Sequence, residues 1–190
     1  MEMETLTLRI EGKTPLVMHN ARLADPIDPA AIAVAEIAGK RKKTRADHEE
    51  LARREWRGGL YTDDAGRPAL TGEQIEKVII EGARKVRAGK EAECGILCDG
   101  VWAIDYDGPK DLDALCEDLR FRDRRSVVVS RRRVMRTRPR FDAWSATFKV
   151  MFNPEVLNAS AVEDGLRRGG RLVGIGDYRP RFGRFEIIGA

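Results

Sequence analysis

The stretch DAWSATFKVMF, residues 142–152, is the most regular part of the chain. Apolar and polar residues alternate along it, with Trp144, Ala146, Phe148, Val150 and Phe152 on one face and Ser145, Thr147 and Lys149 on the other. Alternation with a period of two is typical of a strand that buries one face. The segment therefore predicts a half-buried strand, and the rest of the fold is built outward from it.

Further strands and helices are expected on both sides of this strand. Residues 5–10 alternate in the same way and predict a first strand. Thr71–Gln74 has the pattern of a capping box and predicts a long helix, in which Gly82 would allow close packing against the sheet. A helix after Asn153 and a last strand over residues 184–188 complete the order. This order predicts an α+β fold with a ferredoxin-like or RRM-like antiparallel sheet and helices on one side.

The length of 190 residues suits a single domain, residues 1–190, with two additions. Residues 30–57 predict a helical insertion. Residues 120–152 predict a long protruding hairpin, whose first arm runs from Ser126 to Thr137 and whose second arm is the strand at 142–152. Pro139–Phe141 would connect the two arms.

The composition excludes several classes of protein. Hydrophobic residues make up 42% of the chain, enough for a core, but no apolar run approaches the roughly 20 residues of a membrane span. The acidic start, Met1–Glu4, lacks the features of a secretory signal, so we expect a cytoplasmic protein without membrane contact. Cys94, Cys98 and Cys116 have no histidine near them, so we expect reduced thiols and neither metal nor cofactor.

Charge is distributed very unevenly along the sequence. Residues 120–140 contain ten arginines and one acid, Asp123, a net charge of +9. Residues 91–119 contain nine acids and one base, Lys110, a net charge of −8. A clustered basic stripe is typical of nucleic-acid binding. The acidic stretch predicts either pairing with the protein's own hairpin or head-to-tail association of copies into a homo-oligomer or filament.

The arginines of the expected hairpin are the first candidate site. Arginine offers a planar fork that fits phosphate. In one strand, some of the arginines would face one way and some the other, so part of the strand should project beyond the sheet and lie along a nucleic-acid backbone. The alternatives are a solvated ribbon or a protein contact. The candidate residues are Arg131, Arg132, Arg133, Arg136, Arg138 and Arg140, together with Lys42 and Lys43 of a second basic cluster.

A loop near the C-terminus is the second candidate. Residues 174–184 combine glycines, arginines and aromatic residues. Glycines let a backbone approach a ligand closely, arginines supply charge, and an aromatic ring can stack on a base. The alternative is a plain turn with Phe182 in the core. The candidate binding residues are Tyr178, Arg179, Arg181 and Arg184.

His19 is the remaining candidate, either as a nucleic-acid contact or as a general base. A polar loop contact is the simpler interpretation. No phosphate-binding loop, nucleophile elbow or paired Cys/His set occurs in the sequence. We therefore predict a protein that binds single-stranded DNA or RNA without catalysis. A metal-independent endoribonuclease that uses His19, or a phage structural or inhibitory protein that binds an acidic protein, is the alternative.

Three segments resemble the RAMP superfamily, the RRM-like proteins that build CRISPR effector backbones. They are Thr14–Met18, Pro68–Gly72 and the loop with Gly174, Gly176 and Gly183; the middle one departs from the usual Pro-Gly-Ser-like turn. The chain also looks like small proteins encoded by tailed phages and prophages, over Leu16–Pro26, Arg41–Leu51 and Gly174–Phe185. These resemblances imply an RRM-like fold, single-strand binding, filament assembly and a bacterial host cell. Catalytic residues do not map onto the chain.

Overall fold

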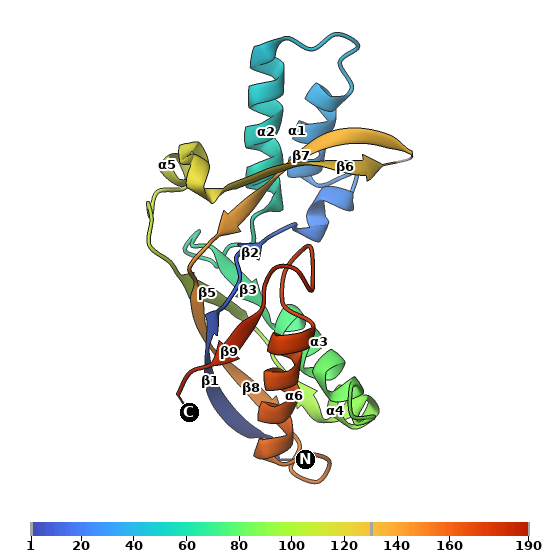
Figure 1. Ribbon diagram of the computed structural model, residues 1–190, viewed down its shortest axis with the longest axis vertical. Coiled ribbons are helices and arrows are strands. Elements are labelled where there is room, and N and C mark those ends of the chain that lie inside the picture. Colours follow the sequence, from blue (N-terminus) through green and yellow to red (C-terminus); the bar gives the residue numbers. More distant parts are fainter. Residues whose placement is uncertain (1, 130, 190) are drawn as a thin grey trace. The chain divides into compact units, whose positions relative to one another are not determined.

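The computed structural model describes residues 2–129 and 131–189 and has an α+β fold (Figure 1). The chain divides into two compact units. The sheet unit comprises Met1–Leu16, Thr62–Asp107 and Asp142–Ala190, and the hairpin unit comprises Val17–Tyr61 and Gly108–Phe141. The hairpin unit therefore combines the helical insertion with part of the arginine-rich region.

The sheet unit has the expected ferredoxin-like antiparallel sheet. Its strands lie in the order β3 (Ala69–Thr71), β5 (Val101–Asp105), β8 (Ser145–Phe152), β1 (Glu4–Gly12) and β9 (Phe185–Ile187), and β4 (Ile96–Leu97) also pairs with β8. Leu8 of β1 lies opposite Phe148 of β8, and both side chains are buried. The alternating pattern of residues 142–152 thus marks the strand at the centre of the sheet.

Helices α3 (Gly72–Arg84) and α6 (Ala159–Leu172) lie side by side in the sheet unit, with the shorter α4 (Gly89–Gly95) beyond them (Figure 1). The capping box is present, since Thr71 accepts from the backbone of Gln74 and the Gln74 side chain accepts from the backbone of Thr71. The expectation that Gly82 packs on the sheet is wrong. A Cβ atom at Gly82 would lie 2.0 Å from the carbonyl oxygen of Gly165, so Gly82 instead lets α3 approach α6.

The hairpin unit contains helices in the range where a helical insertion is expected, residues 30–57. Its helices are η1 (Ala21–Ala24), α1 (Pro29–Ala38), α2 (Arg45–Gly59), α5 (Leu112–Glu117) and η2 (Leu119–Phe121). Asp28 caps α1, and Thr44 with Asp47 forms a capping box at the start of α2. The three strands lie in the order β2 (Leu16–Val17), β7 (Arg132–Phe141) and β6 (Arg122–Val129).

The predicted pairing of the hairpin is wrong. Strands β6 and β7 pair with each other, Val129 opposite Arg132 and Asp123 opposite Arg138, so the hairpin spans residues 122–141. The strand at 142–152 pairs with β1 and β5 instead. The chain reverses between β6 and β7 with Arg131 at a φ of 65°, in the left-handed region. Because that region favours glycine, an arginine gave no sign of a turn, and the two arms read as one strand.

The hairpin unit has its own small core. Trp56 of α2 is fully buried, and its Nε1 donates to the carbonyl oxygen of Phe121 at 2.7 Å. The rings of Phe121 and Phe141 lie 5.7 Å apart at a tilt of 59°. These contacts fix α2 against the start of β6 and the end of β7, and so position the base of the hairpin.

Candidate nucleic-acid interface

The arginines at the base of the hairpin are engaged with buried carboxylates. Glu55 of α2 is 5% exposed, and one of its oxygens lies 2.7 Å from Nη1 of Arg136. Its other oxygen accepts the backbone N–H of Thr137 at 2.9 Å. A buried carboxylate needs such partners, because desolvation of an unpaired charge costs several kcal/mol. Arg136 is therefore held by the fold.

Asp123 of β6 has the same role on the neighbouring strand. It is 4% exposed and forms ion pairs with Arg125 and, at 3.9 Å, with Arg140. Arg138 is itself buried, with 9% of its surface exposed. Three of the six predicted hairpin arginines, Arg136, Arg138 and Arg140, are therefore partly or largely enclosed within the hairpin unit. This enclosure could not be predicted from the sequence, because the pairing of Arg136 depends on a carboxylate in a distant helix.

Part of the acidic stretch is also used within the hairpin unit. Glu117 pairs with Arg53 and Arg122, and Asp118 pairs with Arg120. Asp113 pairs with Arg57. Residues 113–118 thus neutralise arginines of their own unit, and two of those arginines belong to the +9 segment.

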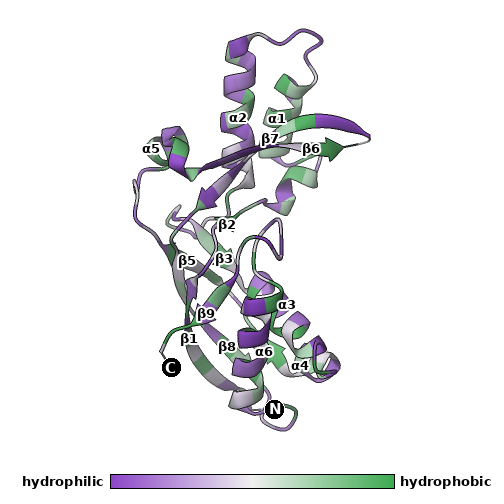
Figure 2. Cartoon of the chain, viewed as in Figure 1, coloured by the Kyte–Doolittle hydropathy of each residue, from purple (hydrophilic) through white to green (hydrophobic). Residues whose placement is uncertain are grey.

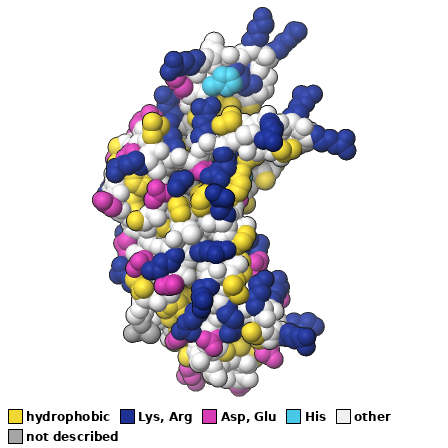
Figure 3. Space-filling view, viewed as in Figure 1, with side chains coloured by type: hydrophobic (Ala, Val, Ile, Leu, Met, Phe, Trp, Pro, Cys, Tyr) yellow, Lys and Arg dark blue, Asp and Glu magenta, His cyan; other side chains and the backbone are white. Residues whose placement is uncertain are grey.

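The remaining cations of the hairpin, three at its end and one on β6 opposite Thr137, are different. Arg131, Arg132 and Arg133 are exposed, and so is Arg124 on β6. In the part of the chain that the structure describes, none of these four forms an ion pair with a carboxylate. The same holds for Arg41, Lys42 and Lys43, in the loop between α1 and α2. We call these seven residues the open cation set, and Figure 3 shows Lys and Arg side chains projecting from both places.

Lys40 stands apart from its neighbours in the loop. Its ammonium group donates to Asp47, and together with the bonds from Thr44 this holds the pKa of the Asp47 carboxyl well below its usual range. The carboxylate is therefore charged throughout the neutral range and neutralises Lys40. Lys43 donates instead to the backbone carbonyl of Lys40 at 2.8 Å, which leaves its charge uncompensated.

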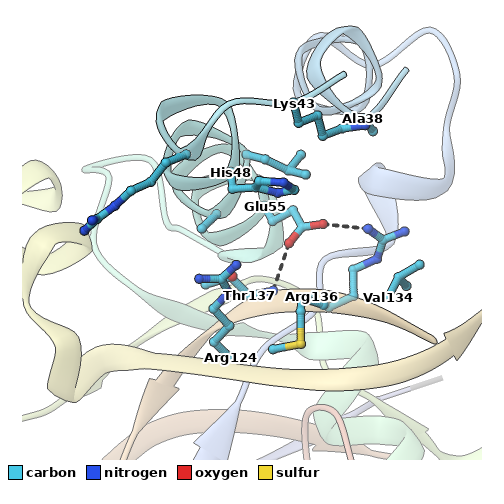
Figure 4. Close-up of a pocket in the computed structure, with 12 residues that line it drawn as sticks. Ala38, Lys43, His48, Glu55, Arg124, Val134, Arg136 and Thr137 are labelled. Carbon is cyan, nitrogen blue, oxygen red and sulfur yellow. Dashed lines mark hydrogen bonds and ion pairs between the residues drawn. The ribbon is translucent and has the colours of Figure 1, made fainter. Parts of the chain in front are cut away.

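A groove lies between α2 and β7 and brings the two parts of the open cation set together (Figure 4). Its volume is about 850 Å³. Lys43 and Arg124 both line it, and Leu51, Val134 and Met135 contribute apolar surface. Glu55 lines it too and holds Arg136 and Thr137. Arg41, Arg124 and the wall formed by α2 were not predicted as parts of the site. Only Arg41 had a signal in the sequence, the basic run beside Lys42.

Apolar side chains are exposed next to these cations. Val128 is 64% exposed and Met135 is 47% exposed. Figure 2 shows hydrophobic residues at the end of β6 beside hydrophilic ones at the start of β7. The hairpin therefore offers both charge and apolar contact to a ligand.

His19 is exposed and lies at a second, smaller cavity of the hairpin unit. The cavity has a volume of about 180 Å³ and is also lined by Glu55, Arg136 and Arg138. The backbone carbonyl of His19 accepts from the hydroxyl of Tyr61 at 3.5 Å. His19 thus lies near charged groups that the sequence could not have placed beside it.

The C-terminal loop belongs to the sheet unit. Phe182 is buried, as the simpler interpretation predicted, and its ring lies edge-on to that of Tyr178 at 6.4 Å. Arg179 pairs with Glu81 at 3.7 Å, whereas Arg181 and Arg184 are exposed. Gly183 is required by packing, since a Cβ atom there would lie 1.7 Å from the carbonyl oxygen of Ile175. The glycine at this position is explained by the fold without a ligand.

Neither a metal-binding cluster nor a membrane-spanning helix is found among the described residues. Over residues 2–129 and 131–189, no group of three or more His, Cys, Asp or Glu residues is placed to hold a metal ion. Within the same residues, no helix has both the length and the apolar character needed to span a membrane. Comparison with known proteins found no family model that matches the chain and no curated protein that matches it.

Proposed function

We propose that this protein binds single-stranded nucleic acid through the open cation set of the hairpin unit and does not cleave it. The observation that carries the proposal is the sorting of charges within one unit. Carboxylates compensate Arg53, Arg57, Arg120, Arg125 and Arg136. The seven cations of the open set have no carboxylate, and they gather on one loop and one hairpin.

Seven like charges close together repel one another and attract a polyanion. Binding to phosphates releases the counterions that condense on a nucleic acid, which makes the association favourable at low salt. Arginine and lysine side chains on a ribbon and a loop can follow a flexible backbone. This supports a nucleic acid rather than a small anion, because a small anion would meet only one or two of the seven cations.

The exposed apolar residues favour a single strand over a duplex. Bases in a duplex are stacked and paired, whereas those of a single strand can contact apolar side chains. Val128, Val129 and Met135 lie among the arginines of the hairpin and are exposed. Such contacts are tolerant of sequence, so the proposal does not distinguish DNA from RNA. Together with the resemblance to phage-encoded proteins, this function leads us to propose a location in the cytoplasm of a bacterial host.

Fluorescence anisotropy with labelled oligothymidylate and oligouridylate tests the proposal. We expect binding at low salt and a steep loss of affinity as salt rises, with a slope of about 0.7 per phosphate contact. Substitution of Arg131, Arg132 and Arg133 by alanine should weaken binding and reduce that slope by about 2. Absence of binding of the unaltered protein at low salt would contradict the proposal.

A matched control removes the same charge elsewhere. Arg9, Arg84 and Arg167 of the sheet unit are exposed and ion-paired with Asp105, Glu93 and Asp164. Their triple replacement by alanine changes the net charge by the same amount, and we expect nearly unaltered affinity. Equal losses in both triple variants would show that only net charge matters, and the open cation set would then have no special role.

Head-to-tail assembly of several copies along one strand is part of the same proposal. It relies on acids of the −8 stretch that form no ion pair within the described residues, such as Glu91, Asp99 and Asp107. Sedimentation velocity with and without oligothymidylate tests it. Larger species that appear with the oligonucleotide support assembly, and a monomer under all conditions contradicts it.

The alternative of a metal-independent ribonuclease has one observation in its favour. His19 shares a small cavity with Arg136 and Arg138, and such a combination of base and cations suits attack on a phosphodiester. RNA incubated in the presence of a chelator distinguishes the two functions. We expect no cleavage by the protein or by the His19→Ala variant. Cleavage that His19→Ala abolishes would replace the binding function by this one.

A further inference from the structure

The outer edge of β7 changes character along its length. At its end, the carbonyl oxygen of Pro139 accepts from the backbone N–H of Met18 at 3.0 Å. Two residues earlier, the N–H of Thr137 donates to Glu55. Both groups point away from β6, and backbone groups two residues apart in a strand point the same way. The outward groups of Met135 and Arg133 therefore continue this edge.

Nothing in the described residues covers that continuation. Met135 and Arg133 stand opposite Ser126 and Val128 of β6 as pairs that exchange no backbone hydrogen bond, and their outward groups have no partner among the described residues. Beyond Thr137, the groove of about 850 Å³ separates β7 from α2, whose side chains His48, Leu51 and Ala52 form the opposite wall. An edge strand with free backbone groups beside a groove is the arrangement that accepts an additional strand.

The charges at this edge select the kind of strand that fits. Arg131, Arg132 and Arg133 lie at the start of the edge, and Lys43 and Arg124 line the groove. A second copy of β7 would bring its own arginines against these, and like charges that face each other across a strand pair are destabilising. Acidic side chains would instead be complementary. Leu51, Val134 and Met135 offer apolar surface to the residues that alternate with them.

We infer that the edge of β7 pairs with an extended acidic segment of a partner protein. The backbone of Arg133 and Met135 would bond to that segment, and its apolar side chains would lie against Leu51 and Val134. The cations of the open set favour both ligands, but this docking also requires the outward backbone groups of Arg133 and Met135, which the proposed nucleic-acid function does not use. Either can fail without the other.

Nuclear magnetic resonance of the ¹⁵N-labelled full chain tests the inference with a defined probe. The probe is the capped peptide Glu-Val-Glu-Val-Glu-Val-Glu, and its control has the same sequence with every backbone nitrogen methylated. The control keeps the charges and side chains but cannot donate from its backbone. We expect the amide signals of Arg133 and Met135 to shift with the probe, and the control to bind at least about tenfold more weakly, as loss of two hydrogen bonds implies.

A protein variant tests the same backbone pairing by removing a donor from the protein instead of from the peptide. Met135→Pro removes one outward N–H without removing a bond to β6, and edge positions of this kind tolerate proline. Met135→Ala is the matched control, because both variants lose the Met135 side chain and only the proline also loses the N–H. We expect Met135→Pro to bind the peptide about fivefold more weakly than Met135→Ala does, for the loss of one hydrogen bond. If Met135→Pro does not fold, the comparison of the probe with its methylated control still tests the inference, because both peptides are measured on the unaltered protein.

Three results would overturn the inference. One is the absence of any shift at Arg133 and Met135 with millimolar probe. Another is equal affinity for the methylated control, which would mean that charge alone attracts the peptide. The third is displacement of the probe by oligothymidylate together with the same shifts at Arg133 and Met135, which would assign the groove to nucleic acid. The first two leave the oligonucleotide measurements, and so the proposed function, untouched.

Discussion

The carboxylate of Glu55 joins helix α2 to strand β7 by accepting from the guanidinium of Arg136 at 2.7 Å and from the backbone of Thr137 at 2.9 Å. Glu55 and Arg136 are 81 positions apart in the chain. Glu55 is buried, so this contact neutralises an arginine within the wall of the groove. An arginine that pairs with a buried carboxylate in this way is unavailable to a ligand, unlike the members of the open cation set.

Replacement of Glu55 should destabilise the hairpin unit. Glu55→Ala leaves Arg136 and the N–H of Thr137 without their acceptor, and we expect the free energy of unfolding to fall by about 2–3 kcal/mol. Glu55→Gln keeps an acceptor and should cost less. Urea denaturation followed by tryptophan fluorescence measures this. Glu49→Ala, which removes an exposed pair with Arg45, is the control and should change little; equal effects would contradict the assigned role.

Two arginines on one face of β7 should differ in their effects, one on the stability of the protein and the other on its binding of nucleic acid. Arg136 is paired with Glu55, whereas Arg132 is exposed and belongs to the open cation set. We expect Arg136→Ala to lower the urea midpoint and leave a folded protein that binds oligothymidylate almost normally. Arg132→Ala should leave the midpoint unchanged and weaken binding. The reverse result in anisotropy would show that the sorting of the arginines is wrong.

Substitution of Gly82 should separate the helices of the sheet unit. Even a methyl group at this position would lie 2.0 Å from the backbone of α6, so Gly82→Ala forces α3 and α6 apart. Overpacking of this kind costs about 1–3 kcal/mol or more, and we expect a lower melting temperature in calorimetry. Lys77→Ala, on the exposed side of α3, is the matched control and should melt with the unaltered protein.

The three thiols should differ in reactivity. Cys94 is exposed, whereas burial raises the pKa of Cys98 to about 11 and also raises the pKa of Cys116. Only the thiolate reacts with iodoacetamide, so at pH 8 we expect Cys94 to be labelled first and the other two only after unfolding. Mass spectrometry of the digested protein identifies the labelled residue. Rapid labelling of Cys98 in the folded protein would contradict its burial.

The raised pKa of Cys98 also gives stability a pH dependence. The Cys98 thiol stays neutral to a higher pH in the folded protein than in the unfolded chain, where its pKa is about 9. The stabilising contribution is therefore complete below pH 9 and is lost as the pH rises through about 11. Urea midpoints should fall over this interval, and the fall should be smaller in a Cys98→Ala variant.

Much of the sheet unit was predictable from local patterns. Alternation identified β1 and β8, and the sequence Thr71–Gln74 identified the start of α3. Such patterns work because a strand with one buried face and a capped helix are each determined by residues only a few positions apart. The turn between β6 and β7 was not predicted, because Arg131, which has a left-handed backbone there, is not a glycine.

The candidate site was predictable only in part. The sequence indicated an excess of arginine and the presence of Lys42 and Lys43, but it ranked Arg136, Arg138 and Arg140 equally with Arg131, Arg132 and Arg133. Whether an arginine is available to a ligand depends on the carboxylates that fold against it. Glu55 and Asp123 make that difference here.

The strands, the capped helices and the amount and sign of charge therefore follow from the sequence alone, because these are properties of single residues and near neighbours. Two features depend on the folded chain: the pairing of residues 142–152 with β1 and β5 instead of with the arginine segment, and the set of cations that remains uncompensated. Both depend on contacts between residues far apart in the chain, such as Glu55 with Arg136. Such contacts form only when the whole unit has folded.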